Sequence, residues 1–258
     1  MGQAVLEAAL PDSGFKLVGA LEIPASALLG HDAGERMGTV TGVTVTANIP
    51  VAIAGADVLI DFTRPEGTLA NVGACAQAKV AAVVGTTGLT GADKRALAEY
   101  GRAVPIVLAP NMSVGVSVLA RLVELSAQLL GDAYDVEILE MHHKHKVDAP
   151  SGTALHLGEA AARALGHDLK SHAVFAREGV TGERKPGTIG FATLRGGDVV
   201  GEHKVIFAGA GERIELAHKA GSRSNFAHGA LRAARFVAEK RAAGVTGLFD
   251  MQDVLSLR

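Results

Sequence analysis

The sequence predicts an α/β protein whose first half forms a parallel, doubly wound sheet, because short apolar runs alternate there with helical patterns. Four runs have the length and composition of strands, at residues 15–21, 58–62, 80–84 and 106–109. Helical patterns are clearest at residues 67–78 and 92–100. In such a sheet the loops at the carboxyl ends of the strands form the binding crevice.

The pattern changes after Ser113, which predicts a second domain. A long amphipathic helix is expected at 114–130, then a strand at 135–142, an alanine- and leucine-rich helix at 153–165, and a glycine-rich β region from Val174 through Glu215. Residues 194–203 and 213–219 fit antiparallel strands joined by turns. A helix at 226–241 and the tail then return to the first domain. We therefore expect domains at 1–113 with 223–258 and at 114–222.

Composition excludes several classes of function. The chain has 258 residues, 48% hydrophobic content and a formal charge of −2. It therefore lacks the excess of positive charge that would attract nucleic acid. No uninterrupted apolar run approaches the ~20 residues of a membrane span, and the N-terminus lacks a signal-peptide pattern. A cytoplasmic protein is expected. The one cysteine, Cys75, is expected to be a buried apolar residue.

The most informative stretch is residues 140–154, Glu-Met-His-His-Lys-His-Lys-Val-Asp-Ala-Pro-Ser-Gly-Thr-Ala, where three imidazoles and two ammonium groups precede a helix start. The first amides of that helix, near Ser151, Gly152 and Thr153, favour a carboxylate. The hydroxyls of Ser151 and Thr153 can add donors, and Gly152 allows close backbone approach. The pattern predicts a site for a doubly anionic substrate.

His142 and His143 end a strand, so their side chains should leave it on opposite sides. An imidazole can donate a proton near neutrality, and Lys146 offers a fixed charge for a second carboxylate. A histidine is nevertheless more often packed or solvated than catalytic. Zinc is not expected, because there is no His-Glu-x-x-His motif and only one cysteine. Lys144 and His145 are interpreted as solvated loop residues.

Glu22 follows the first predicted strand and could accept hydrogen bonds from the ribose hydroxyls of NADH. A phosphate on that ribose would be repelled, so NADH is expected to be preferred over NADPH. The alternative is that Glu22 is simply a polar strand terminus.

The signature at 140–154 resembles that of the 4-hydroxy-tetrahydrodipicolinate (dihydrodipicolinate) reductase family, and the resemblance covers nearly the whole chain. Further matching blocks are Asp61-Phe62-Thr63-Arg64-Pro65-Glu66-Gly67-Thr68, Val84-Gly85-Thr86-Thr87-Gly88, Ala109-Pro110-Asn111-Met112-Ser113-Val114-Gly115-Val116 and residues 177–184, 187–191 and 247–251. The family fold is a Rossmann-like cofactor domain plus an α+β domain whose mixed sheet binds substrate and forms a homotetramer.

The resemblance implies that His142 is the proton donor and Lys146 its catalytic partner. It implies that the substrate carboxylates are bound by His143, Lys146, Ser151, Gly152 and Thr153. It implies cofactor contacts from Met1, Gly2, Glu22, Arg64, Gly85, Thr86, Thr87, Ala109, Pro110, Asn111 and Met112. The implied reaction is NADH- or NADPH-dependent reduction of a cyclic imine in lysine biosynthesis through diaminopimelate. Many relatives carry an arginine after the ribose-binding acid, where this chain has Ile23.

The chain departs from the family at its start. Met1-Gly2 look like the last two residues of a Gly-x-x-Gly-Arg-Met-Gly loop, with residues 3–10 as its helix, so the first strand is expected to be missing. A misassigned start would explain this, and supply of the strand by another segment or subunit is the alternative. An inactive cofactor-binding or scaffold protein, or another nicotinamide-dependent dehydrogenase on the same fold, remains a competing hypothesis.

Overall fold

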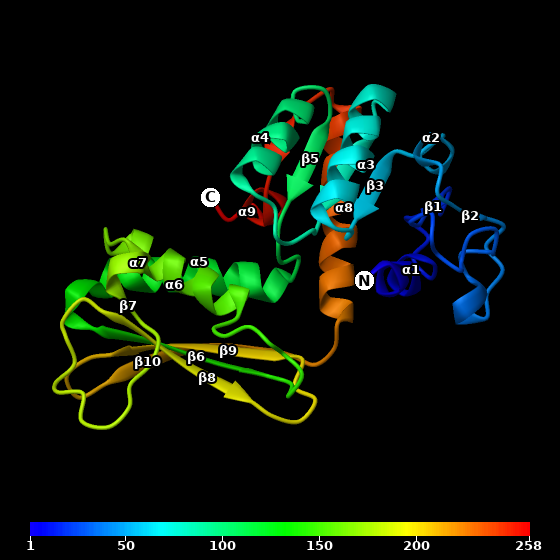
Figure 1. Ribbon diagram of the computed structural model, residues 1–258. Coiled ribbons are helices and arrows are strands. Elements are labelled where there is room, and N and C mark those ends of the chain that lie inside the picture. The colour runs from blue at the N-terminus through cyan, green and yellow to red at the C-terminus, as the bar shows by residue number, and fades with distance from the viewer. The chain divides into compact units, whose positions relative to one another are not determined.

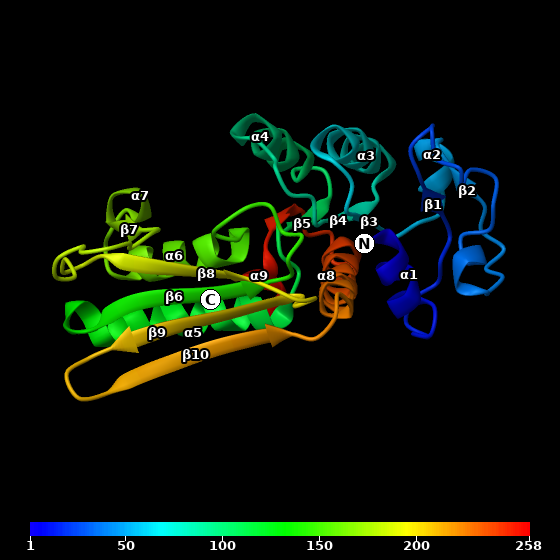
Figure 2. The same cartoon turned by 60° about the horizontal axis from the view of Figure 1, so that its bottom comes forward.

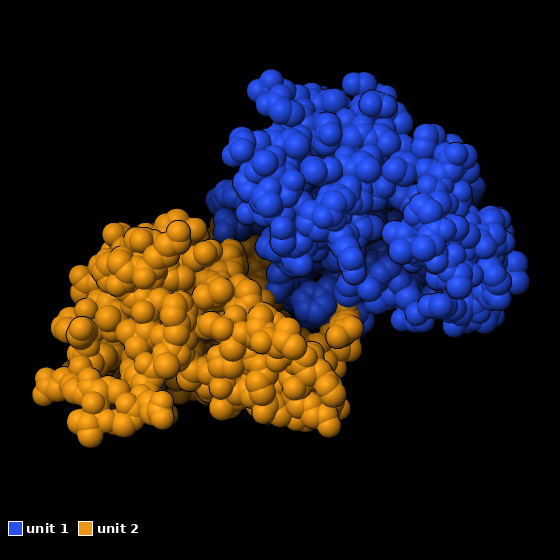
Figure 3. All heavy atoms as spheres, viewed as in Figure 1, with its two compact units in different colours: residues 1–113, 224–256, 258 blue, residues 114–223, 257 orange.

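The computed structural model describes residues 1–258 and divides into two compact units. Unit 1 comprises Met1–Ser113 and Ser224–Ser256 with Arg258, and unit 2 comprises Val114–Arg223 with Leu257. Figure 3 colours the two units. Apart from Leu257, the chain thus leaves unit 1 once, builds unit 2 as a continuous segment, and returns.

Unit 1 is built on a four-stranded parallel sheet, which confirms the doubly wound α/β prediction. Its strand order is β11-β5-β4-β3, with bounds β3 Val58–Asp61, β4 Ala81–Val84, β5 Pro105–Leu108 and β11 Gly247–Phe249. Helices α3 (Pro65–Ala78) and α4 (Gly91–Tyr100) cover one face, and α8 (Ser224–Ala242) covers the other (Figures 1 and 2). All four residues of β4 are buried, as expected for a strand covered on both faces.

Local sequence explains where these helices begin. Pro65 occupies the first turn of α3, where a missing N–H costs nothing. Thr90 and Asp93 form a reciprocal capping box at the start of α4. Helix α8 approaches the loop after β5 so closely that a Cβ on Gly229 would lie 1.7 Å from the Met112 carbonyl oxygen. Only glycine fits there, which fixes the position of that loop.

The prediction of a strand at residues 15–21 was wrong for most of its length. Only β1 (Ala20–Leu21) is a strand, and it pairs in parallel with β2 (Val45–Thr46) in a separate two-stranded sheet. The apolar side chain of Phe15 instead packs with α1 (Gly2–Ala9) and α8, and the Arg235 guanidinium lies 4.6 Å from its ring centroid. The start of the apolar run therefore packs against helices, and only its last two residues pair as a strand. Strand β3 is the last strand on its side of the four-stranded sheet.

Short elements complete unit 1. They are η1 (Glu35–Met37), α2 (Ile49–Ala52) and α9 (Met251–Leu255). Helix α1 agrees with the helix expected at residues 3–10, and α9 begins with a capping box formed by Asp250 and Asp253.

Unit 2 contains a five-stranded mixed sheet of order β10-β9-β6-β8-β7, covered on one face by two helices (Figure 1). The strands are β6 Asp135–His142, β7 Ala173–Val174, β8 Ile189–Arg195, β9 Gly201–Ala208 and β10 Arg213–Ala220. The helices are α5 Val114–Leu130 and α6 Gly152–Ala164, with short η2 Gly131–Ala133 and α7 Leu169–His172. The expected mixed sheet is confirmed. Residues 213–219 lie in β10, which pairs antiparallel with β9 as expected. Residues 194–203 are not one strand: they end β8, turn, and begin β9, and β6 lies between these two strands.

Helix α5 supplies much of the core of unit 2. Leu119, Val123 and Ala127 are buried against Ile138 of β6 and Leu157 of α6. By length and composition the stretch Val114–Ala133 could also cross a membrane, with mean hydropathy 1.4 and 33% of its window buried. The core helix of a globular unit passes the same test.

Candidate active site

The site is built around the end of β6, the central strand of unit 2. Residues Val136, Ile138 and Glu140 alternate as the buried positions of this strand, and His142 continues the same side. A carboxylate thus takes the place of the next apolar side chain in the series. Its burial requires that its oxygens be paired.

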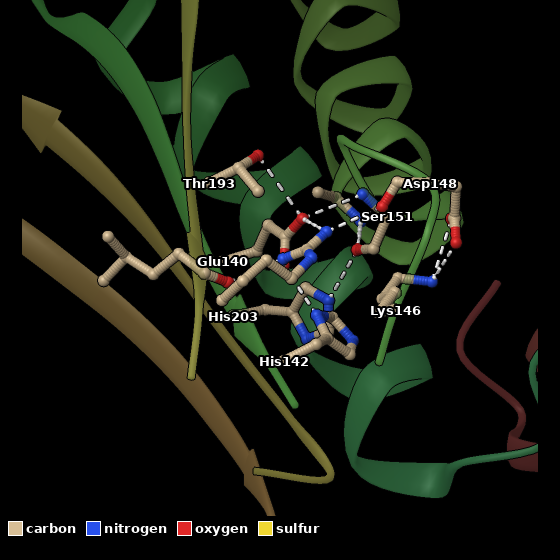
Figure 4. Close-up of polar contacts among 10 residues, drawn as sticks. Glu140, His142, Lys146, Asp148, Ser151, Thr193 and His203 are labelled. Atoms are coloured by element: carbon tan, nitrogen blue, oxygen red, sulfur yellow. Dashed lines mark hydrogen bonds and ion pairs between the residues drawn. The ribbon is translucent and has the colours of Figure 1, made fainter. Parts of the chain in front are cut away.

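Glu140 is 1% exposed and is held by donors from three segments (Figure 4). Arg195 of β8 donates to both carboxylate oxygens at 2.8 and 2.9 Å, and His142 Nδ1 lies 2.6 Å from Oε2. The Ser151 amide donates to Oε1 at 3.0 Å. Burial opposes ionisation, but the hydrogen bonds from Arg195, His142 and the Ser151 amide more than offset it and hold the pKa of Glu140 below its usual range.

A second imidazole lies next to His142. His203 of β9 is 5% exposed, and its ring meets that of His142 edge to face with centroids 5.1 Å apart. Its Nε2 lies 3.0 Å from Ser151 Oγ. Burial, followed by the charge of His142, lowers the pKa of His203 to about 4. His203 is therefore neutral near pH 7.

The signature loop after β6 is attached to the β8–β9 turn by backbone hydrogen bonds. The His143 amide donates to the Val199 carbonyl at 2.7 Å, and the Lys144 amide to that of Gly197 at 3.2 Å. Arg195 also donates to the Asp148 carbonyl at 2.7 Å. These contacts fix the loop that carries Lys146.

Lys146 is 20% exposed, and its Nζ contacts both carboxylate oxygens of Asp148 at 2.7 and 2.8 Å. The hydrogen bond from Lys146 holds the pKa of Asp148 below its usual range. Asp148 is itself exposed, so this pair is accessible to an incoming anion. Lys144 and His145 are exposed, in agreement with their interpretation as loop residues.

The start of α6 places the residues expected to bind a carboxylate in one helical turn, with one correction. Ser151 is the N-cap and its Oγ accepts from the Ala154 amide at 3.1 Å, but the Ser151 amide is not free, since it donates to Glu140. The amide of Gly152, the first helical residue, has no acceptor within the helix. A Cβ on Gly152 would meet no protein atom within 4 Å, so packing does not demand glycine here. Thr153 follows in the same turn, and His143 is half-buried beside the exposed His145.

The positions expected to bind cofactor lie in unit 1. Arg64, Gly85, Thr86, Thr87 and the run from Ala109 through Met112 follow β3, β4 and β5, so the parallel register places them at one edge of the sheet. Thr87 and Pro110 are exposed there, whereas Ala109 and Met112 are buried. Asn111 Oδ1 accepts from the Ser113 amide. A Cβ on Gly85 would lie 2.1 Å from the Phe62 ring, which explains the glycine.

A buried carboxylate also organises this edge. Asp61, 2% exposed, accepts from the Thr63 amide at 2.7 Å, from Asn71 Nδ2 at 2.8 Å, and from the Thr68 hydroxyl at 3.2 Å. The Thr68 hydroxyl lies 2.6 Å from that of buried Thr86. The loops after β3 and β4 are thereby joined.

The remaining positions expected to bind cofactor, Met1, Gly2 and Glu22, do not belong to the loops after β3, β4 and β5. Glu22 is exposed after β1, with Oε2 accepting from the Ile23 amide. Met1 and Gly2 begin α1, and Met1 makes no side-chain cap hydrogen bond.

Sequence reasoning missed Glu140, Asp148, Arg195, His203 and Asp61 as parts of these sites. Glu140 had a local signal, because a carboxylate two residues before His142 on one strand shares its side. Arg195 and His203 had none, since their proximity depends on which strands lie beside β6. No group of three or more His, Cys, Asp or Glu side chains is arranged to hold a metal ion.

Comparisons with known proteins agree over the full chain. The family model "Dihydrodipicolinate reductase, N-terminus" matches residues 1–112, and "Dihydrodipicolinate reductase, C-terminus" matches residues 115–255. The 4-hydroxy-tetrahydrodipicolinate reductase of Cupriavidus pinatubonensis is 57% identical over all 258 residues, which span 96% of that relative. The enzyme of the same name from Thiobacillus denitrificans is 56% identical and is covered to 95%.

Solved structures support the fold. A dipicolinate-bound dihydrodipicolinate reductase from Paenisporosarcina sp. TG-14 is 22% identical with a TM-score of 0.73, covering 98% of this chain and 94% of that one. An amine dehydrogenase from Mycobacterium smegmatis is 12% identical with a TM-score of 0.57, covering 95% and 90%. With both family models matched end to end and curated relatives above half identity, the chain belongs to the dihydrodipicolinate reductase family.

Proposed function

We propose that this chain reduces 4-hydroxy-tetrahydrodipicolinate to tetrahydrodipicolinate with loss of water, in lysine biosynthesis through diaminopimelate. The observation that carries the proposal is the arrangement in unit 2 of a proton-donating imidazole, an ammonium group and a helix N-terminus on one short segment. A cyclic imine with two carboxylates needs those three functions. Curated relatives with that activity in their name match the whole chain.

Each residue of unit 2 has a distinct task in this reaction. The substrate carboxylates bind to Lys146 and to the Gly152 amide, either one at each group or one at both. Ser151 and Thr153 complete the helix N-terminus around that amide. His143 borders the loop. His142 donates a proton through Nε2 to the ring atom beside the reduced carbon, because its Nδ1 is occupied by Glu140. Asp148 holds Lys146 until a substrate carboxylate competes for it.

A nicotinamide cofactor fits the edge of unit 1. The exposed carboxylate of Glu22 can accept hydrogen bonds from ribose hydroxyls, and the loops after β3, β4 and β5 each contain exposed residues. When bound, the cofactor supplies the hydride. Arg64, Gly85, Thr86, Thr87, Ala109, Pro110, Asn111 and Met112 would bind and orient it in these loops, and Met1 and Gly2 at the start of α1 would lie at the pyrophosphate.

The direct test is NADH oxidation by the full chain with aldolase-generated hydroxy-tetrahydrodipicolinate. Turnover that falls at least about 100-fold in His142→Ala supports the proposal, as expected for loss of a general acid. Lys144→Ala is the matched control, because this exposed neighbour is assigned no role and its loss should leave the rate unchanged. Absence of turnover in the unaltered protein, or full activity of His142→Ala, would contradict the assignment.

We also propose that NADH is preferred over NADPH. Glu22 would repel a 2′-phosphate, and Ile23 offers no charge to compensate for it. The ratio of kcat/KM for the two cofactors measures the preference, and Glu22→Gln should move it toward NADPH. Equal values of kcat/KM for the two cofactors in the unaltered chain would refute the preference.

The working form is proposed to be a cytoplasmic homotetramer assembled through unit 2. The face of its sheet opposite α5 and α6 carries half-buried side chains such as Leu139 and Ile206, which oligomer contacts would cover. Light scattering should then report four times the 26.4 kDa of one chain. A monomer at micromolar concentration would exclude this form.

A further inference from the structure

Glu140 differs from an ordinary buried ion pair because its donors belong to parts of the site with different tasks. His142 lies on the same strand, the Ser151 amide begins α6, and Arg195 lies on β8. The guanidinium donates to both oxygens, yet the carboxylate also accepts from the other two donors. A carboxylate needed only for neutralising Arg195 would not have to lie between the imidazole and the helix.

The contact at 2.6 Å determines which nitrogen of His142 can exchange a proton. Since an ionised carboxylate only accepts hydrogen bonds, His142 Nδ1 must carry the hydrogen in that contact. Nε2 is therefore the nitrogen that gains and loses the proton. Gly201 lies beside it, and a Cβ there would approach Nε2 to 3.0 Å, so the absence of a side chain keeps that nitrogen uncrowded.

The groups around His142 come from every neighbouring element. Glu140 and Arg195 form the charged pair on one side, and His203 of β9 contacts the ring from the sheet. Behind His203 lies His218 of β10, its partner in the strand register, and Lys146 lies in the loop. Burial lowers the pKa of both His203 and His218, which favours the neutral form of these two imidazoles. Glu140 is the carboxylate in direct contact with the His142 imidazole.

We propose that Glu140 is a positioning residue: its carboxylate confines proton donation to His142 Nε2 and, through the Ser151 amide, keeps the N-terminus of α6 in fixed register with that imidazole. This inference rests on the proposed role of His142 and adds the residue through which the acid and the anion seat are aligned. Loss of Glu140 would disturb both together, although it touches neither substrate nor cofactor.

The test compares Glu140→Gln with Glu137→Gln. Glu137 lies on the same strand and binds Arg177 and Arg184 with its two oxygens at 2.8 to 3.1 Å, so its loss removes a similar ion pair without contacting His142. Histidine labelled with ¹⁵N reports protonation at each ring nitrogen in the free protein, and His142→Asn identifies the signal. We expect Nδ1–H at high pH in the unaltered protein and in Glu137→Gln, and a substantial Nε2–H fraction in Glu140→Gln.

Kinetics supply an independent readout. Glu140→Gln should lower kcat about 10- to 100-fold, less than complete loss of the acid, and should move the alkaline limb of the kcat profile to lower pH. It should also weaken binding of pyridine-2,6-dicarboxylate severalfold. Glu140→Asp keeps the charge and should restore the Nδ1–H form in part. If Glu140→Gln does not fold, Glu140→Asp can be compared with Glu137→Asp in the same way. The expected changes in the His142 spectrum and in the rate are then smaller.

An unchanged His142 spectrum in Glu140→Gln, or equal effects of the two Gln variants on rate and pH profile, would overturn the positioning role. Because the spectrum is recorded without substrate or cofactor, this result is separate from the turnover assay. Inactivity of the unaltered protein would count against the proposed reaction and leave the tautomer comparison intact.

Discussion

At the scale of single residues, burial decides what a polar side chain does. Glu140 and His203 are both almost inaccessible, yet one is ionised and the other neutral, because Glu140 has Arg195 and His142 as donors whereas His203 has only Ser151 Oγ. His142 and Lys146 could be identified from sequence because they occur in a dense local run. Their direct partners, Glu140 and Asp148, lie only two residues away in the sequence. Arg195 and His203, which complete the cluster, are distant in sequence and could not be identified from it.

Protonation of His203 should make stability depend on pH. Its folded-state pKa of about 4 lies below the usual 6.5, so the unfolded chain binds the proton more tightly. The stabilisation is fully present above pH 6.5 and is lost as the pH falls toward 4, by at most about 3 kcal/mol at 1.36 kcal/mol per pH unit. Urea unfolding of the unaltered protein and His203→Gln between pH 4 and 7 should show a smaller pH slope in the variant. Identical slopes would refute this account.

Gly152→Ala tests whether the glycine serves a ligand and not the fold. Because an added Cβ meets no protein atom, the free energy of unfolding should change by less than about 1 kcal/mol. The methyl group would instead obstruct a carboxylate at the helix N-terminus, so calorimetry should show at least about tenfold weaker binding of pyridine-2,6-dicarboxylate. Gly166→Ala would not be a matched control, since Gly166 has a positive φ. Unchanged affinity would place the carboxylate elsewhere.

At the scale of elements, helix starts were the most predictable features. Helices α4 and α6 each begin one residue before the starts expected at 92 and 153, and residues 114–130 form the expected helix. Short strands were less predictable, because residues 15–21 have strand-like composition but Phe15 packs against helices. Periodicity reports that a side chain is buried, not which element covers it.

The cap of α6 should have a double function. Ser151→Ala removes the hydroxyl that accepts from the Ala154 amide and should cost about 1 kcal/mol of stability. It should also weaken dicarboxylate binding, because Ser151 links the helix start to His203. Thr90→Ala is the matched control: it removes a comparable cap from α4 in unit 1 and should lower the melting temperature alone. Equal dicarboxylate affinity in all three proteins would limit Ser151 to capping.

At the scale of the whole molecule, the two units carry different chemistry. Unit 1 has a parallel sheet whose loops are joined through Asp61, and unit 2 has the cluster around Glu140. We propose that the former is the dinucleotide-binding domain and the latter the substrate-binding and tetramerisation domain. Each unit has its own core, with Val72 and Ile106 in one and Leu157 and Phe207 in the other.

A pair of substitutions can separate the two functions. Asp61→Asn should loosen the loops after β3 and β4 and raise the Kd for NADH at least about fivefold, as expected when a buried hydrogen-bond acceptor is weakened. It should leave pyridine-2,6-dicarboxylate affinity within about twofold. Lys146→Ala should weaken the binding of pyridine-2,6-dicarboxylate and leave the affinity for NADH nearly unchanged. Titration of each ligand alone against both variants checks this, and loss of both affinities in either variant would contradict the division.

The sequence by itself determined the family, the α/β class, the main helices and the residues of the signature loop, because these depend on composition, periodicity and contiguous motifs. Only the tertiary structure decided that β6 lies between β8 and β9 and so brings Arg195 and His203 to Glu140. It also decided that the Ser151 amide is already bound, and that residues 20–21 pair with β2. Strand order and the partners of buried polar groups follow from the packing of distant segments, which no local pattern specifies.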